Sequence, residues 1–322
     1  MATLYITSQE NGSGKTSICA GLASHLINNG RKVTFLKPVI GSKAESADND
    51  AVLMKQLLAL DESIDLISPN FSDGASLLKG INNAVSKTGQ GKDTVIIEGI
   101  AAQSAIEAMD AQVIAVETMS TDLDTIITAY KNFGSQLLGI IINKVPTTKL
   151  KQMRAEASAA LEQAGIKLLG VLPEDRTLIA MTVTELAELL QGEIISSSEK
   201  SLDLVENFMM GALSIDPGPH YFSRKTNKAV IIRSGRTDMQ LATLETSTSC
   251  MVLTGNEVIQ PVVLDRAKEK SVPIILTGDE LPDVAASIET AIGKSGFNQE
   301  KLERIGELLD QNFDSEQLHK RL

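Results

Sequence analysis

The chain has 322 residues, of which 43% are hydrophobic and 22% charged, so its composition is that of a globular protein with room for two domains. Its formal net charge of −11 disfavours a nucleic acid or an anionic membrane as partner, and two distant cysteines, Cys19 and Cys250, argue against a disulfide framework or a zinc knuckle. It shows neither a basic leader nor an apolar stretch long enough to span a bilayer, so we expect a cytoplasmic protein.

In chain order, the first 190 or so residues alternate short apolar runs with amphipathic segments. This alternation predicts an α/β fold, with a mainly parallel sheet, helices on both faces and a ligand site at the carboxyl ends of the strands. The predicted strands cover 3–7, 32–39, 94–99, 111–117, 136–143 and 167–173, and the predicted helices cover 15–28, 50–60, 74–88, 122–133 and 148–164.

The second half predicts a smaller α/β domain. Residues 182–212 are typical of a helix, a short strand, a polar break at 196–200 and another helix, and 217–224 are typical of a loop. We therefore expect a first domain over 1–195, a connecting helix or linker over 196–215 and a second domain over 216–322. The later predicted strands are 228–233, 250–255 and 272–278, and the later helices are 237–246, 260–270, 283–293 and 298–313.

The stretch "YITSQENGSGKTSICAGL" (5–22) places a glycine-rich loop between the first strand and the first helix. It ends as the phosphate-binding pattern G-x-x-x-x-G-K-[ST] does, although Gln9 stands at the first glycine. Backbone N–H groups at such a helix start favour phosphate, Lys15 would neutralise it during catalysis, and Thr16 would hold Mg²⁺. The alternative is a plain turn in which Ser13 or Thr16 caps the helix. The predicted nucleotide-binding residues are Glu10, Asn11, Gly12, Ser13, Gly14, Lys15, Thr16 and Ser17.

The glycine-rich loop and three further segments resemble the same protein family. The partitioning ATPases carry a lysine five positions before the phosphate lysine, whereas this chain has Glu10 there. The loop resembles instead that of the dethiobiotin synthetase-like proteins, as do "FLKPVIG" (35–41), "IIEGI" (96–100) and "GIIINKVP" (139–146). The resemblance spans about the first 175 residues and implies a P-loop domain that binds ATP and Mg²⁺.

Each segment supplies a candidate side chain. Lys37 ends a strand and could place its ammonium on the transferring phosphate, as a catalytic group, or form only a salt bridge. Glu98 ends a buried strand, where a carboxylate needs a cation such as Mg²⁺. One of Asp48 and Asp50, taken here as Asp50, could join this metal shell or cap the next helix. The resemblance implies that Asn143 reads an adenine edge.

The same resemblance does not identify a substrate. After Glu98 the synthetase pattern continues into glycines that help to bind substrate, whereas this chain has isoleucine and two alanines over 100–102. Residues 173–176, "PEDR", could line the base or substrate cleft or be only a turn.

Residues 227–256 resemble the DRTGG domain, which is fused to dethiobiotin synthetase-like domains at the N-terminus of long bacterial phosphate acetyltransferases. Gly235, Arg236, Thr237 and Asp238 occupy its strand-to-helix turn. Arg236, Thr237 and Asp238 could bind a small anionic effector. Alternatively, Thr237 or Asp238 could simply cap the helix.

Two functions remain open. One is an ATP- and Mg²⁺-binding regulator or sensor that could hydrolyse ATP slowly, with a small-molecule effector at the second domain and a homo-oligomer or a metabolic enzyme as partner. The other is an ATP-dependent ligase that activates a carboxylate or carbamate. Phosphate acetyltransferase activity itself is not expected, because in the fused proteins the transferase domain follows this region and the chain ends before one could begin.

Overall fold

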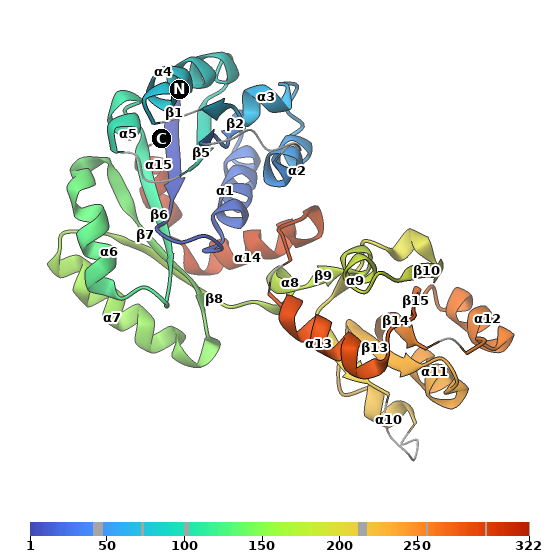
Figure 1. The fold of residues 1–322 in the computed structure, drawn as a ribbon. Coiled ribbons are helices and arrows are strands. Elements are labelled where there is room, and N and C mark those ends of the chain that lie inside the picture. Colours follow the sequence, from blue (N-terminus) through green and yellow to red (C-terminus); the bar gives the residue numbers. More distant parts are fainter. Residues whose placement is uncertain are drawn as a thin grey trace. The chain divides into compact units, whose positions relative to one another are not determined.

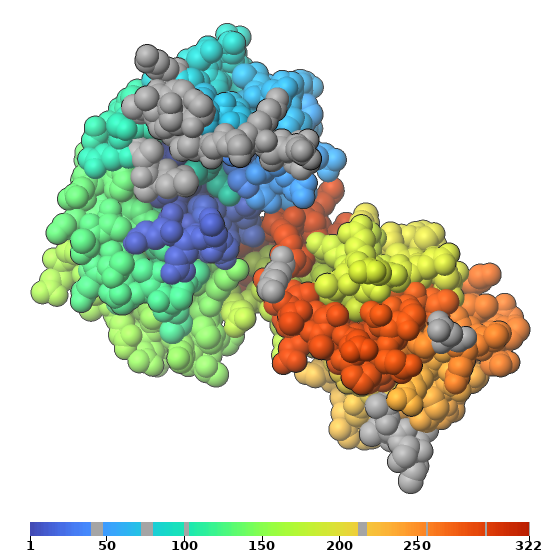
Figure 2. Space-filling model, in the orientation of Figure 1, coloured from blue at the N-terminus to red at the C-terminus, as the bar shows by residue number. Residues whose placement is uncertain are grey.

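The computed structural model describes residues 1–40, 48–71, 74–99, 103–211, 218–255, 257–293 and 295–321 (Figures 1 and 2). The chain forms two compact units, of which one comprises Met1–Glu174 with Phe297–Leu322 and the other Asp175–Gly296. In these described ranges, no helix combines the length and the apolar character needed to cross a membrane.

The first unit is built on a six-stranded sheet in the order β2-β5-β1-β6-β7-β8. Every neighbouring pair is parallel, and the strands are almost entirely buried, as apolar strands covered on both faces should be. The predicted α/β fold class is therefore confirmed. The strands are β1 (Ala2–Thr7), β2 (Val33–Leu36), β5 (Thr94–Glu98), β6 (Gln112–Thr118), β7 (Leu137–Val145) and β8 (Leu168–Pro173).

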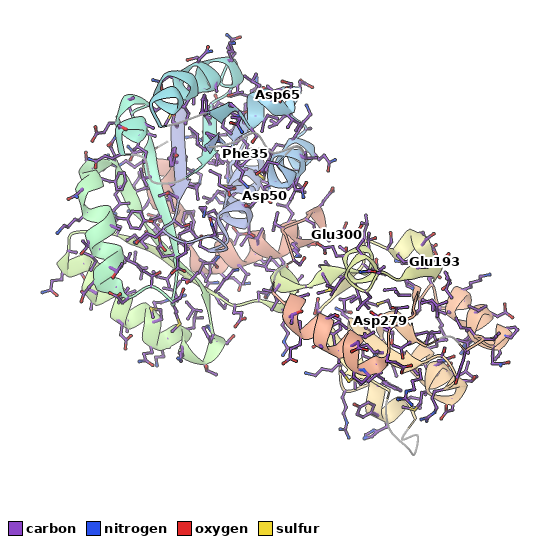
Figure 3. The ribbon with its side chains drawn as sticks, in the orientation of Figure 1. Phe35, Asp50, Asp65, Glu193, Asp279 and Glu300 are labelled. Atoms are coloured by element: carbon purple, nitrogen blue, oxygen red, sulfur yellow. The ribbon has the colours of Figure 1, made fainter. Side chains whose placement is uncertain are left out.

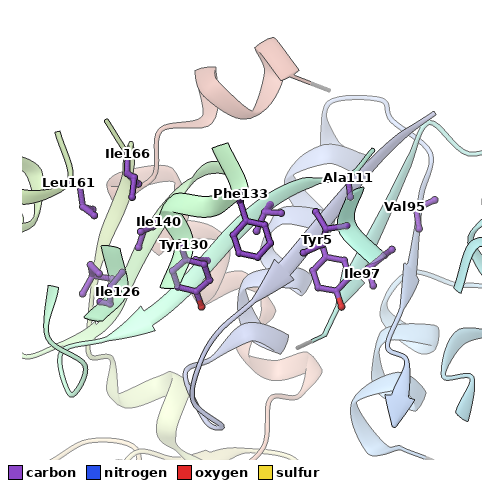
Figure 4. Packing of buried hydrophobic residues seen from close by; sticks show 14 of the residues in the cluster. Tyr5, Val95, Ile97, Ala111, Ile126, Tyr130, Phe133, Ile140, Leu161 and Ile166 are labelled. Atoms are coloured by element: carbon purple, nitrogen blue, oxygen red, sulfur yellow. The ribbon is translucent and has the colours of Figure 1, made fainter. Parts of the chain in front are cut away.

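Helices cover both faces of this sheet (Figure 1). Alternate strand residues such as Tyr5, Ile97 and Ile140 form one core with side chains from the helices on that face (Figure 4). The opposite face carries α1 (Lys15–Asn28). The other helices are α2 (Asn49–Leu57), α3 (Ile64–Ile67), α4 (Gly74–Thr88), α5 (Gln103–Ala108), α6 (Leu123–Tyr130) and α7 (Leu150–Gln163), and a two-stranded ribbon joins β3 (Val39–Ile40) to β4 (Asn70–Phe71).

The C-terminal segment returns to the first unit, whereas the sequence assigned it to the second domain. Helix α14 (Leu302–Asn312) packs on α1 and β8, and α15 (Ser315–Arg321) follows it. The approach is close at Gly21, where an added Cβ would lie 2.5 Å from Leu309 Cδ1. The compact units thus divide after Glu174, earlier than the predicted boundary at 195, because packing partners distant in sequence define them.

The second unit holds a five-stranded sheet in the order β10-β15-β14-β13-β12. Strand β10 is antiparallel to β15 and the remaining pairs are parallel, with one apolar core on each face. Its strands are β10 (Glu193–Ser196), β12 (Asn207–Met210), β13 (Lys228–Arg233), β14 (Thr248–Thr254) and β15 (Ile274–Thr277), and its helices are α8 (Arg176–Ile179), α9 (Val183–Leu189), α10 (Pro219–Phe222), α11 (Thr237–Leu244), α12 (Pro261–Glu269) and α13 (Leu281–Ala291).

Two local predictions in this unit are wrong. The helix expected after the polar break is replaced by strands, namely β11 (Leu204–Val205), which pairs with β9 (Met181–Thr182), and β12. Strand β12 pairs with β13, so its backbone hydrogen bonds go to a partner that the local sequence does not reveal. The segment 217–224, expected as a loop, contains the short helix α10.

Candidate functional site

The loop between β1 and α1 depends on two glycines in the left-handed region. Gly12 has φ of 76° and Gly14 has φ of 93°, a conformation that costs a residue with a Cβ atom free energy. A Cβ on Gly14 would also lie 2.4 Å from Asn143 Nδ2. Gly14 is the N-cap of α1 and the helix has no side-chain cap hydrogen bond, so the alternative of a plain turn capped by Ser13 or Thr16 does not describe this loop.

The Lys15 side chain contacts the loop that precedes helix α1. Its Nζ donates to Ser8 Oγ at 2.6 Å and to the Glu10 carbonyl at 3.2 Å. Ser8 Oγ in turn donates to the same carbonyl at 2.6 Å. The ammonium is thus held by neutral oxygens, from which a phosphate could draw it with stronger charge-assisted hydrogen bonds.

Thr16 and two carboxylates meet beside the loop, at the carboxyl end of the sheet. Thr16 Oγ1 lies 3.1 Å from Glu98 Oε1, at the end of β5, and 3.2 Å from Asp50 Oδ2. Asp50 lies in the first turn of α2 (Figure 3). Asp48 is the N-cap of α2 and accepts from the Ala51 N–H at 3.0 Å. The sequence left open which aspartate faces the metal position, and the structure brings Asp50 to Thr16.

Lys37 joins the same cluster. Its Nζ donates to Asp50 Oδ2 and lies 3.3 Å from Asp48 Oδ1 and 3.7 Å from Glu98 Oε1. Burial disfavours the charged ammonium, but the carboxylates of Glu98, Asp50 and Asp48 outweigh burial and raise the pKa of Lys37. One ammonium therefore faces three carboxylates, and the cluster keeps an excess of negative charge.

Glu98 is the most buried member of the cluster, with 4% of its surface exposed. Burial raises the pKa of its carboxyl, and the nearby Lys37 ammonium opposes that rise. Its Oε2 atom is buried without a hydrogen-bond partner in the part of the chain that the structure describes. A free carboxylate oxygen next to a second carboxylate and a hydroxyl is a ligand set that suits Mg²⁺.

These residues fit Mg²⁺ only as part of a shared site. Over the described ranges, no three His, Cys, Asp or Glu side chains converge as a complete protein-only metal site. Mg²⁺ bound with a nucleotide takes the rest of its ligands from phosphate and water, so one or two carboxylates and a hydroxyl are the contribution expected from the protein.

The end of β7 holds the loop from the other side. Asn143 Nδ2 donates to the Ser13 carbonyl at 2.9 Å, and Lys144 Nζ donates to the Gly12 carbonyl at 2.8 Å. Lys144 adopts a φ of 56°, an uncommon conformation for a residue with a side chain. Two consecutive residues thus hold two consecutive loop carbonyls. The adenine-reading role of Asn143 stays a prediction.

The remaining predicted loop residues have different surroundings. The Glu10 carboxylate accepts from Ser120 Oγ at 3.0 Å and from Thr121 Oγ1 at 3.1 Å. Asn11 is exposed on the loop, and Ser17 lies in the first turn of α1.

Sequence reasoning missed several residues that contact the loop, namely Ser8, Glu117, Ser120, Thr121 and Lys144. Glu117 is fully buried in β6, and its Oε1 accepts from the Gln9 N–H at 2.8 Å. The signal that singled out Glu98, an acidic residue near the end of an apolar strand, is also present at Glu117.

In the second unit, Arg236 pairs with Asp238 through two hydrogen bonds of 2.9 and 2.7 Å. These bonds lower the pKa of the Asp238 carboxyl. Helix α11 has no side-chain cap hydrogen bond, so neither Thr237 nor Asp238 caps it as one alternative predicted. The Arg236 charge is already compensated locally, and the effector role of this turn stays a prediction.

The chain is similar to several known proteins. The phosphate acetyltransferase of Synechocystis is 22% identical over 98% of this chain and 51% of its own length. The ATP-dependent dethiobiotin synthetase BioD of Methanocaldococcus jannaschii is 24% identical over 52% of this chain and 92% of its own length. The structure of the MinD cell division protein of Aquifex aeolicus has a TM-score of 0.37 and 17% identity over 56% of this chain and 85% of its own.

The chain spans about half the length of the curated phosphate acetyltransferases that it matches. The shared part is their N-terminal region. Residues 185–291 match the DRTGG domain, and residues 4–186 match the CobQ/CobB/MinD/ParA nucleotide binding domain. The chain therefore belongs to the CobQ/CobB/MinD/ParA nucleotide-binding family and carries a DRTGG domain after its nucleotide-binding domain.

Proposed function

We propose that this chain binds Mg-ATP at the loop of its first unit and acts as a regulator or sensor. The observation that carries the proposal is the meeting of Thr16, Asp50 and Glu98 beside Lys15 and Lys37. These side chains come from α1, α2, β5 and the end of β2, and they converge at the strand ends where parallel sheets bind ligands.

Each group has a defined part in this proposal. Thr16, Asp50 and Glu98 would hold Mg²⁺, which shields the phosphate charge when it is bound. Lys15 would leave Ser8 for the phosphates, and Lys37 would add a second positive charge near them. The loop N–H groups and the N-terminus of α1, which has no side-chain cap, would donate hydrogen bonds to the phosphate oxygens.

Calorimetric titration of the full chain with Mg-ATP tests this site. Lys15→Ala should abolish measurable binding, because the ammonium of a phosphate loop is worth orders of magnitude in affinity or rate. Lys151→Ala, on the exposed face of α7, is the matched control and should bind as the wild type does. Equal affinity of the Lys15→Ala and wild-type proteins would refute nucleotide binding at this loop.

Lys37 separates a nucleotide role from a structural one. If the ammonium only neutralises Asp48, Asp50 and Glu98, Lys37→Ala should lower the melting temperature and leave ATP turnover per folded molecule intact. If it also faces the phosphate, turnover should fall by orders of magnitude in protein that remains folded. Measuring both quantities on each variant distinguishes the two outcomes.

The regulatory part of the proposal predicts coupling between ATP and a second ligand. A thermal-shift panel of metabolites, run with and without Mg-ATP, should reveal a compound whose binding depends on the nucleotide. A ligand at 100 times its Kd stabilises the native state by about 2.7 kcal/mol, which is easily detected. Lack of such a compound, with ATP consumed stoichiometrically only when a small carboxylate or amine is present, would favour the ligase instead. The ligase is kept as the second candidate function because the chain matches 92% of the length of BioD.

A further inference from the structure

Glu117 lies on the opposite side of the loop from the Mg²⁺ candidates. Strand β1 runs between β5 and β6, so Glu98 and Glu117 flank the loop that follows β1. The last residue of β1, Thr7, pairs with Ala115, which places Glu117 two residues further along β6, beside the start of the loop. Its side chain is completely buried.

The Glu117 carboxylate connects β6 with the start of the phosphate loop and with the end of α6. Its Oε1 accepts from the Gln9 N–H at 2.8 Å and from the Tyr130 hydroxyl at 2.5 Å, at the end of α6. Tyr130 is itself 1% exposed and packs in the core, so its hydroxyl is a fixed donor. Gln9 is the residue at the first glycine position of the phosphate pattern.

The second oxygen of the Glu117 carboxylate adds to the free-energy cost of burying this side chain. Oε2 is buried and has no partner among the residues that the structure describes. Leaving a carboxylate oxygen unpaired costs free energy, and a glutamine or an apolar residue at this position would avoid the burial of a charge. The contacts that compensate this cost are the charge-assisted bonds from the Tyr130 hydroxyl and from the Gln9 N–H of the loop.

Resting on the proposed binding of Mg-ATP, we infer that Glu117 is a positioning residue that fixes the entry of the phosphate loop through the Gln9 N–H, with Tyr130 as its anchor. A first glycine gives a phosphate loop its entry geometry by conformational freedom. Here the buried Glu117 carboxylate holds the start of the loop instead. Ser120 and Thr121, which follow β6, donate hydrogen bonds to the Glu10 carboxylate. A preorganised loop loses less conformational entropy when phosphate binds.

The ionisation of Glu117 gives this role a specific pH dependence. Burial raises the pKa of Glu117, the bonds from Tyr130 and Gln9 oppose that rise, and the nearby Glu10 and Lys15 charges have smaller, opposite effects. Protonation changes the charge-assisted bond to Gln9 into a neutral one of roughly half the strength. Loop positioning should therefore weaken as the pH falls through the raised pKa.

The test compares wild type, Glu117→Ala, Glu117→Gln and Tyr130→Phe as full chains, by calorimetric titration with Mg-ATP from about pH 5 to about pH 8. Glu117→Ala should bind about tenfold more weakly near pH 8, the value of one hydrogen bond to a charged group. Glu117→Gln keeps a neutral acceptor and should lose only a few fold near pH 8. Its affinity should converge with that of the wild type as the pH falls through the raised pKa of Glu117, because both acceptors are then neutral.

ATP itself and Glu98 also titrate, but they do so in both proteins. Their contributions therefore cancel in the ratio of wild-type to Glu117→Gln affinity. Tyr130→Phe should move the midpoint of this ratio to higher pH, since the lost hydroxyl donor had lowered the pKa of Glu117. Glu107→Gln, an exposed acid of α5, is the control for removing one charge and should match the wild type at each pH.

Amide hydrogen exchange of the segment around Gln9, measured without nucleotide, separates this inference from the proposed function. Exchange should be about tenfold faster in Glu117→Ala than in the wild type. A wild type that fails to bind Mg-ATP would refute the proposed function, while the exchange rates would still decide whether Glu117 holds the loop. Unchanged exchange in Glu117→Ala, or a wild-type to Glu117→Gln ratio that is constant with pH, would overturn the inference.

Discussion

The packing of α14 on α1 predicts a strong and unusual response to substitution at Leu309 and Gly21. Leu309 is 3% exposed, and its Cδ1 occupies the place that a side chain on Gly21 would need, 2.5 Å from the ideal Cβ position. Ile305 lies nearby, with Cγ1 at 3.2 Å from that position. Helix α1 begins at Lys15, so α14 supports the helix that carries the phosphate-binding groups.

Truncating Leu309 to alanine leaves a cavity between the two helices. Buried Leu→Ala changes cost about 2–5 kcal/mol, and about 3 kcal/mol lowers the melting temperature of a domain of this size by roughly 6–12 °C. Gly21→Ala in the wild type combines about 1–3 kcal/mol of overpacking with a gain of about 0.5–1 kcal/mol in helix propensity, so we expect net destabilisation. In the Leu309→Ala background the same methyl has room.

The double variant should therefore be at least as stable as Leu309→Ala alone, with a favourable coupling of about 1–2 kcal/mol. Scanning calorimetry of wild type, both single variants and the double variant measures this coupling, and the transition that Mg-ATP shifts identifies the first unit. Ile27→Ala, on the same helix but 41% exposed, should change stability by less than about 0.5 kcal/mol. Additive effects, or a Leu309→Ala protein as stable as the wild type, would show that α14 does not pack here.

Further changes test the loop and the buried charges. Gly14→Ala should abolish ATP binding and cost about 1–3 kcal/mol by thermal unfolding, because of its φ of 93° and the contact with Asn143; normal binding would refute it. Asn143→Ala should weaken ATP more than GTP by calorimetry, and an equal loss would leave only its bond to the loop. The raised pKa of Glu98 means that the folded chain keeps a proton that the unfolded chain releases, so this group's stabilisation is present at low pH and is lost as pH rises above the ordinary glutamate value. Glu98→Gln should therefore melt at a less pH-dependent temperature than the wild type without Mg²⁺, and an unchanged pH profile would contradict this. Burial lowers the pKa of Lys228 to about 8, so above that pH the unfolded chain binds more protons than the folded chain. The stability of the wild type should therefore rise from about pH 8 towards about pH 10, whereas that of Lys228→Met should not.

Much of the candidate site could be predicted because its signals are local. A loop with Gly12 and Gly14 before a helix, a lysine at the end of β2 and an acid at the end of β5 all show in short stretches of sequence. The topology rule that parallel strands end at one edge then brings these stretches together. The same reasoning could not choose between Asp48 and Asp50, because the first turn of α2 offers both and only the tertiary structure shows which faces Thr16.

Glu117 was missed for a related reason. A buried acid near a strand end indicates that a partner is needed but does not identify it, and here the partners are a backbone N–H and a tyrosine hydroxyl from other elements. Asn143 and Lys144 were visible as a polar strand end, but their contacts with two loop carbonyls required the register of β7 against its neighbours and the positive φ at Lys144.

The sequence by itself determined the strand–helix alternation of both units and the phosphate loop, because hydrophobic period, glycine placement and charge at strand ends act within a few residues. The tertiary structure alone decided that 207–210 form an edge strand and that 297–322 return to α1. A strand needs a hydrogen-bonding partner and an amphipathic helix needs an apolar surface, and the local sequence specifies the need without specifying which distant segment meets it.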